Sequence, residues 1–292
     1  MSSKQLSVFD IFSGIGGFSL GLEKAGMQTI AFCEINQFCQ KVLRKHWQSV
    51  PIFSDVTVID KKDLKALPRI DVIAGGFPCQ DISIAGKQAG ITAKRSGLWK
   101  EFARLINEVR PKYAIIENVA NLRSKGLISV LQDLWAIGYD AEWHCIPASA
   151  FGAPHRRDRI WIIAHPACID KIRLSCTKKK TQSTTGDSNK NVFSYKILGL
   201  DGHYQFQEVR KVSQEEISIY RNTKGFAQWG IEPKTIPRLK EERLNPDWVE
   251  WLMGFPQGWT EGGSRRQRIQ SLGNAVVPLI PEFLGEVILN EI

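Results

Sequence analysis

The sequence predicts an α/β protein with a doubly wound, mostly parallel sheet and a second, smaller domain. Three observations lead to this prediction. Up to about residue 165, short apolar segments of strand length alternate with segments of helical periodicity. Several apolar segments end in glycine or a carboxylate, as expected where reactive groups gather at the carboxyl ends of parallel strands. After His165 the alternation stops, and the chain is polar and basic as far as Leu244.

Composition limits the class of protein. The chain has 292 residues, 43% of them hydrophobic and 24% charged, which is typical of a soluble globular protein with one large domain or two. No apolar run approaches membrane-spanning length, and the N-terminus lacks signal-peptide architecture. We therefore expect a cytoplasmic protein without membrane contact, nuclear only if the source is eukaryotic.

Charge and cysteine content point to partners and exclude a metal. The net charge of +9 suits a polyanionic partner such as nucleic acid, although many basic proteins bind none. The six cysteines form no C-x-x-C pair, so we expect free thiols and no metal site.

The first strand, Leu6 to Phe12, leads through a glycine-rich turn into a helix ending near Gly26, and a second strand ends at Glu34. The glycine pattern is G-x-G-G, which differs from the dinucleotide fingerprint. Glycines let the backbone approach a ligand, and a carboxylate at this place commonly accepts hydrogen bonds from ribose hydroxyls. A compact adenosyl ligand fits this pattern, and a plain strand–turn–helix is the alternative.

A helix is predicted over 36–47, with Asn36 as its N-cap. A short third strand follows and ends at Asp55. Asp55 is placed to reach a ligand's base, and it is also an ordinary turn residue.

A buried strand begins at Ile70 and ends at Gly75 and Gly76, and Cys79 follows Pro78 at its exit. Because the proline restricts the backbone, it would aim the thiol. The alternative is that Cys79 is a small buried core residue. The glycine-rich segment 84–99 then predicts a loop that closes over a substrate, or a plain long connection.

The remaining elements complete the alternation. A helix is predicted over 98–109, then a strand ending at Glu117, where a carboxylate is costly unless paired or used. A helix over 127–137 and the strand YDAEWHCIPA follow, and three arginines precede a last apolar strand. The segment 167–244 is predicted to be a separate module, in which Lys178 to Lys180 form a solvated run. A helix from about Pro246, a basic segment with a glycine turn, and a final amphipathic helix that docks on the first domain end the chain.

Five stretches stand in a characteristic order: FDIFSGIGGFSLGLEKAG, GGFPCQDIS, ENV, FGAPHRRDRIWIIA and SLGNAVVP. Together they closely resemble the DNA (cytosine-5)-methyltransferase family of bacterial or phage type, over nearly the whole chain. The resemblance implies the S-adenosylmethionine-dependent methyltransferase fold. It also implies a catalytic domain over 1–165, a target-recognition domain over 166–270, and a C-terminal helix over 271–292 that returns to the catalytic domain. The DNA sequence that the second domain recognises stays unknown.

The resemblance also implies a reaction. Cys79 would attack C6 of a flipped-out cytosine, and C5 would then take a methyl group from S-adenosyl-L-methionine. Glu117 would hold or protonate N3. Arg159 would contact O2 of the cytosine base and orient Glu117. Arg157 would help to position the loop and the backbone of the site.

The remaining site residues are implied in the same way. The cofactor would be lined by Phe12, Gly14, Ile15, Gly16, Gly17, Glu34, Ile35, Asp55, Val56, Gly76, Pro78, Asn274 and Ala275. DNA would be contacted by Gln80, Ser83, Lys87, Gln88, His155 and Arg156. The chain departs from the family at His155, where a glutamine is usual and where a histidine could add charge below neutral pH.

The implied partner is double-stranded DNA, bound by a monomer, with a cognate restriction endonuclease acting separately. Three alternatives stay open. The first is an RNA cytosine-5 methyltransferase, which has the same fold. The second is a catalytically inactive DNA-binding protein that keeps this fold. The third is a nicotinamide-dependent dehydrogenase, which would need a longer glycine fingerprint.

Overall fold

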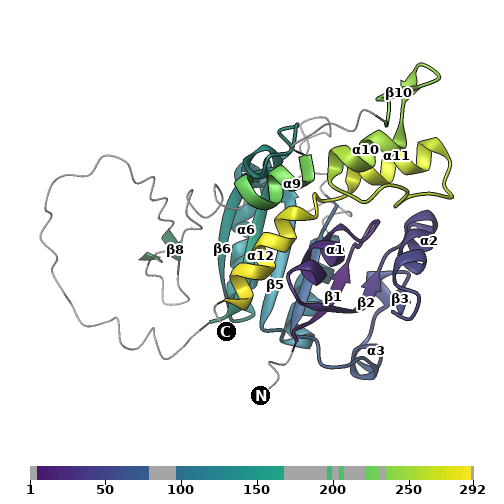
Figure 1. The fold of residues 1–292 in the computed structure, drawn as a ribbon. Coiled ribbons are helices and arrows are strands. Elements are labelled where there is room, and N and C mark those ends of the chain that lie inside the picture. Colours follow the sequence, from purple (N-terminus) through teal and green to yellow (C-terminus); the bar gives the residue numbers. More distant parts are fainter. Residues whose placement is uncertain are drawn as a thin grey trace, which may run out of the picture.

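The computed structural model describes residues 5–78, 97–167, 196–198, 204–206, 221–229 and 235–290. Its centre is a seven-stranded sheet in the order β3-β2-β1-β4-β5-β7-β6 (Figure 1). Neighbouring strands from β3 to β5 are parallel, whereas β7 runs antiparallel to both β5 and β6. The predicted mostly parallel α/β sheet is thereby confirmed. The strands of the sheet are β1 (Ser7–Ile11), β2 (Gln28–Cys33), β3 (Ile52–Phe53), β4 (Val72–Gly76), β5 (Tyr113–Val119), β6 (Tyr139–Pro147) and β7 (Asp158–Pro166).

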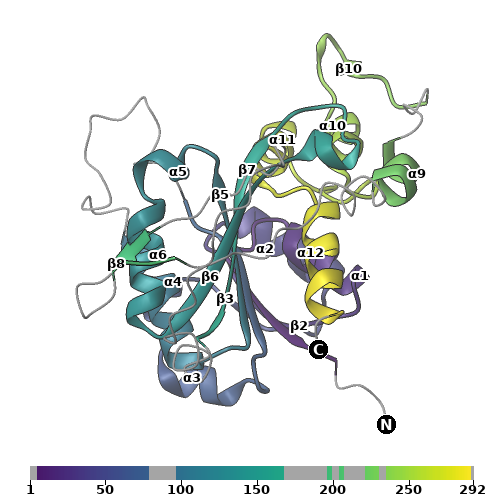
Figure 2. The same ribbon diagram turned by 90° about the vertical axis from the view of Figure 1, so that its left-hand side faces the viewer.

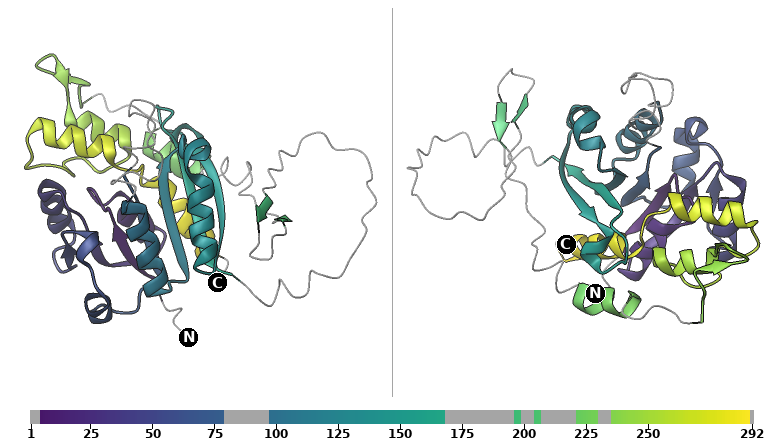
Figure 3. Two further views of the ribbon diagram at one scale, coloured as in Figure 1. Left: turned by 180° about the vertical axis from the view of Figure 1, so that it is seen from behind. Right: turned by 90° about the horizontal axis from the view of Figure 1, so that it is seen from above.

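Helices cover both faces of the sheet, as expected for a doubly wound fold (Figure 2). Alternation along β1 shows why: Val8 packs into the core on the side of α1, α2 and α12, and Phe9 packs into the core on the side of α4 and α6. Seen from behind, the blue-to-teal helices of residues 97–136 cover the second face (Figure 3). The helices of the two layers are α1 (Gly17–Lys24), α2 (Gln37–His46) and α12 (Leu279–Leu289), and α3 (Lys61–Ala66), α4 (Gly97–Val109), α5 (Leu122–Lys125) and α6 (Leu127–Ala136).

The last helix packs on the first. A Cβ atom at Gly21 would lie 2.2 Å from the carbonyl oxygen of Pro278, so the glycine lets α1 and α12 approach closely. Helix α12 therefore lies against the first helix of the chain. The segment Arg265–Leu289 is long and apolar enough to cross a membrane. However, 72% of its 18-residue apolar stretch is buried inside the protein, as in a core helix.

Two helix starts illustrate local sequence control. The Asn36 side chain accepts hydrogen bonds from the backbone N–H of Phe38 and Cys39, which confirms it as the N-cap of α2. The basic segment predicted near the C-terminus forms a helix, α11 (Arg265–Asn274), and because Gly273 lies within it the predicted glycine turn was wrong. The start of α11 is a capping box formed by Ser264 and Gln267.

The remaining described elements are α10 (Pro246–Met253), α9 (Phe226–Trp229), the π-helical turn Arg221–Gly225, the 3₁₀ turns Val56–Val58 and Ala148–Phe151, and two small hairpins, β8 (Lys196–Leu198) with β9 (Tyr204–Phe206) and β10 (Leu239–Lys240) with β11 (Arg243–Leu244). Helix α11 crosses the division drawn at 270/271, and the three-domain division stays a prediction. The predicted loop over 84–99 lies mostly outside the described residues, and the lysine run 178–180 lies wholly outside them.

Candidate active site

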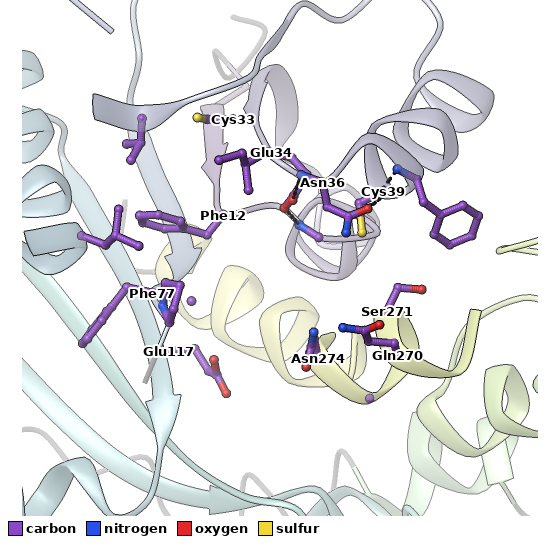
Figure 4. Close-up of a pocket in the computed structure, with 18 of the residues that line it drawn as sticks. Phe12, Cys33, Glu34, Asn36, Cys39, Phe77, Glu117, Gln270, Ser271 and Asn274 are labelled. Carbon is purple, nitrogen blue, oxygen red and sulfur yellow. Dashed lines mark hydrogen bonds between the residues drawn. The ribbon is translucent and has the colours of Figure 1, made fainter. Parts of the chain in front are cut away.

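A cavity of about 630 Å³ opens at the carboxyl ends of the central strands. Its walls come from the ends of β1, β2, β4 and β5, from the start of α2, and from α11 (Figure 4). Glu34 and Asn36 lie on one side of it, Glu117 and Phe77 lie on another, and α11 contributes Asn274. The predicted strand ends therefore converge on one space.

One part of the cavity is built around the Glu34 carboxylate. One of its oxygens accepts a hydrogen bond from the backbone N–H of Gly14, and the other accepts one from Asn36, both at 2.7 Å. Burial raises the pKa of Glu34, although these hydrogen bonds oppose the shift. Asp55 also lines the cavity, and its carboxylate accepts a hydrogen bond from the N–H of Thr57.

Another part holds the pair Glu117 and Arg159. The guanidinium Nε of Arg159 lies 2.9 Å from Oε1 of Glu117, and only 12% of the Glu117 side chain is exposed. Strand β7 is antiparallel to β5, and Arg159 lies opposite Val119, the last residue of β5. The side chains of Arg159 and Glu117 therefore reach the same end of β5. Burial raises the pKa of Glu117, and the positive charges of Arg159 and Arg157 oppose the shift.

Arg157 does not line the cavity, and it contacts the backbone at the end of α11, which does. Its guanidinium donates to the carbonyl oxygens of Gly273 at 2.9 Å and Ala275 at 2.5 Å, on either side of Asn274. Burial lowers its pKa to about 10, with a further contribution from Arg159. Its φ of 38° is unusual for a residue with a side chain, and the two hydrogen bonds hold it there.

The two neighbouring residues assigned to DNA contact already have protein partners. Nε2 of His155 lies 2.9 Å from the carbonyl oxygen of Leu252, and because a carbonyl only accepts, this nitrogen donates. Burial lowers the pKa of His155, so the added charge expected below neutral pH is opposed by its surroundings. The exposed side chain of Arg156 pairs with Asp158 at 2.7 Å.

Most of the predicted cofactor residues line the cavity. These are Phe12, Gly14, Glu34, Ile35, Asp55, Val56, Gly76, Pro78 and Asn274. Four others, Ile15, Gly16, Gly17 and Ala275, are buried beside it and do not line it. Cys79, Gln80, Ser83, Lys87 and Gln88 lie outside the described residues. The roles of all these residues stay predictions.

Several lining residues were not predicted from the sequence. They are Cys33, Asn36, Gln37, Phe38, Cys39 and Ser54, then Phe77, Leu98, Asn118 and Val119, and Gln267, Gln270, Ser271 and Gly273. Those of α11 follow a helical spacing that also includes Asn274, so they present one face of the helix to the cavity. Identifying that helix in the sequence would have revealed them. Among the described residues, no group of His, Cys, Asp or Glu side chains suits a metal ion.

Comparison with known proteins identifies the family. The model of C-5 cytosine-specific DNA methylases matches residues 6–222. The chain belongs to this family. The type II methyltransferase M.DsaV of Dactylococcopsis salina is 34% identical to it, over 100% of this chain and 88% of the relative. M.HhaI of Haemophilus parahaemolyticus is 27% identical over 96% of this chain and 93% of the relative.

Solved structures agree on the fold. S. pombe Dnmt2 methyltransferase superposes with a TM-score of 0.63 at 16% identity, covering 98% of this chain and 99% of that chain. The Entamoeba histolytica methyltransferase EhMeth gives 0.64 at 20% identity, covering 99% of both. The expected family, fold and enzyme class, a cytosine-specific DNA methyltransferase, are therefore confirmed. The dehydrogenase alternative has no support.

Proposed function

We propose that this enzyme transfers a methyl group from S-adenosyl-L-methionine to C5 of a flipped-out cytosine at a specific duplex DNA site, through a covalent bond between Cys79 and C6. One observation carries the proposal. A single cavity contains the Glu34 carboxylate beside the glycine turn and also the Glu117–Arg159 pair. Pro78, on its wall, immediately precedes Cys79 in the sequence.

The residues present suit an adenosyl cofactor. Each oxygen of the Glu34 carboxylate already accepts one backbone hydrogen bond, and each keeps further acceptor capacity for a ribose hydroxyl. Ile35 exposes 74% of its surface, and it lines the cavity together with Phe12, which suits the flat face of an adenine. When bound, the cofactor supplies an electrophilic methyl group. The carboxylates of Glu34 and Asp55 and the polar face of α11 would orient it.

The protein's own groups would activate the cytosine. The Cys79 thiolate forms a bond to C6, and the electron pair of the C5–C6 double bond shifts toward C5, which becomes nucleophilic. Glu117, whose pKa is raised by burial, would donate a hydrogen bond or proton at N3 and so favour this attack. After methylation, loss of the C5 proton returns the electron pair to the ring. The C6–S bond breaks and the thiolate leaves.

DNA must open for this chemistry, because the ring atoms of a stacked base cannot reach a cavity at strand ends. The net charge of +9 favours phosphate contacts, so binding should weaken steeply with salt. We propose that Gln80, Ser83, Lys87 and Gln88 contact DNA around the base. By analogy with the type II names of the relatives, we also propose a restriction–modification setting with a separate endonuclease. We further propose that the enzyme acts as a monomer.

The test is transfer of labelled methyl groups to unmethylated duplex DNA and, in parallel, to tRNA, followed by base-resolution mapping. The proposal expects label on duplex DNA, at cytosines of one short motif. Label on tRNA alone would move the assignment to an RNA substrate. Absence of label with folded, cofactor-bound protein would favour the inactive scaffold.

A further inference from the structure

We infer that Gly76 is a positioning residue for the reaction, because its missing side chain leaves the space in which the Glu117 carboxyl group lies. This inference rests on the proposed role of Glu117. It concerns a residue that was expected only to line the cofactor site.

The geometry is set by strand pairing. Gly76 is the last residue of β4 and lies opposite Glu117 of β5 in the parallel register. A Cβ atom at Gly76 would lie 2.6 Å from Oε2 of Glu117, whereas ordinary contacts of a Cβ atom begin at 3.4 Å. The other oxygen, Oε1, pairs with Nε of Arg159 at 2.9 Å. The carboxyl group is therefore confined between an arginine on one side and a bare backbone on the other.

Backbone conformation does not explain this glycine. The φ angle of Gly76 is not in the positive range, so a residue with a side chain could adopt its backbone angles. Gly75 differs, because a Cβ atom there would lie 2.2 Å from the backbone oxygen of Ile11. Gly75 thus serves strand packing, and at Gly76 the nearest obstacle is the Glu117 side chain.

A methyl group at position 76 would displace the carboxyl group from its present place. The Glu117 side chain would have to rotate away from the added atom, and the Arg159 contact on its other oxygen would lengthen or turn. Misplacement of a reacting group by about 1 Å can cost roughly 10²-fold in rate. The expected loss is therefore in the chemical step.

The experiment is a double-mutant cycle with Gly76→Ala and Glu117→Gln, measured by single-turnover methyl transfer to duplex DNA. We expect Gly76→Ala to lower the rate by roughly 10²-fold. In the Glu117→Gln background the same change should add less than about threefold, because the acid it displaces is already gone. Each variant should be measured at saturating S-adenosyl-L-methionine, so that a change of cofactor affinity at position 76 does not enter the measured rate.

Two results would overturn the inference while leaving the proposed function intact. One is a normal rate for Gly76→Ala when Glu117→Gln is strongly impaired. The other is an equal loss from Gly76→Ala in both backgrounds. A normal rate for Glu117→Gln would instead reject the proposed role of the glutamate. If Gly76→Ala does not fold, Gly76→Ala/Glu117→Ala must fold, because the obstacle has been removed. Failure of that double variant would place the clash elsewhere and reject the inference.

Discussion

The side-chain amide of Asn118 donates a hydrogen bond to the carbonyl oxygen of Phe77 at 3.0 Å. Both residues are buried, at 2% and 7% exposure. The bond joins the end of β5 to the chain that leaves β4, immediately before Pro78 and Cys79. The residue that follows the proposed acid therefore holds the backbone that leads to the proposed nucleophile.

Asn118→Ala should accordingly impair catalysis through position. Without the amide, the Phe77 carbonyl loses a buried hydrogen bond, which costs about 1–3 kcal/mol in unfolding free energy. We expect the rate of methyl transfer to fall by roughly 10²-fold with little change in cofactor affinity. Single-turnover kinetics and cofactor titration measure the two effects. An unchanged rate in a destabilised protein would limit Asn118 to a structural role.

Arg157→Lys should weaken the cofactor site. The carbonyls of Gly273 and Ala275 both accept from one guanidinium nitrogen, Nη2. Lysine keeps the charge, but its shorter side chain ends in a compact ammonium, so we expect it to lose at least one of these hydrogen bonds. Losing one such hydrogen bond should raise the dissociation constant for S-adenosylhomocysteine by about tenfold. Calorimetric titration measures it. Arg69→Lys, at an exposed arginine that pairs with Asp71 at the other end of β4, is the control and should not change this dissociation constant. Equal affinities in parent and Arg157→Lys would show that the two carbonyl contacts do not shape the site.

Asp10 should make stability depend on pH. Its side chain is fully buried, one oxygen accepts hydrogen bonds from Ser19, and burial raises its pKa from 3.8 to about 7. Because the folded pKa is the higher one, this group stabilises the fold fully below about pH 3.8, and the stabilisation is lost as pH rises to about 7.

Asp10→Asn removes that dependence. Relative to the parent, the variant should gain roughly 4 kcal/mol of unfolding free energy between pH 4 and pH 8, because each pKa unit is worth about 1.4 kcal/mol. Denaturant titrations at the two values measure the gain. A constant difference between variant and parent across this range would mean that the Asp10 pKa is not raised in the fold.

The alternating strands and helices of the catalytic half could be predicted because each apolar strand is bounded by glycine or a carboxylate. The N-cap residue Asn36 likewise predicts the start of α2 from local sequence. Helix α11 was missed because its sequence, RRQRIQSLGN, has little apolar periodicity and contains a glycine near its end. Only the spacing of Ser264 and Gln267 signals its start.

The site was predictable where a residue stands at a strand end, as Glu34 and Glu117 do. Contacts between distant segments were not, because no local pattern encodes them. Arg157 reaches Gly273 across 116 residues, and the space beside Gly76 exists only once β4 and β5 pair in register. The antiparallel insertion of β7 between β5 and β6, which brings Arg159 to Glu117, also depends on tertiary packing.

The most direct test of the proposed mechanism is the covalent bond between Cys79 and cytosine C6. Duplex DNA in which 5-fluorocytosine replaces cytosine offers no C5 proton to lose, so the adduct should accumulate in the presence of the methyl donor. Denaturing electrophoresis and peptide mass analysis would then detect it. We predict a stable protein–DNA adduct on the peptide containing Cys79, and none with Cys79→Ala, which should still bind cofactor. An adduct on another residue, or methyl transfer by Cys79→Ala at the parent rate, would contradict this mechanism.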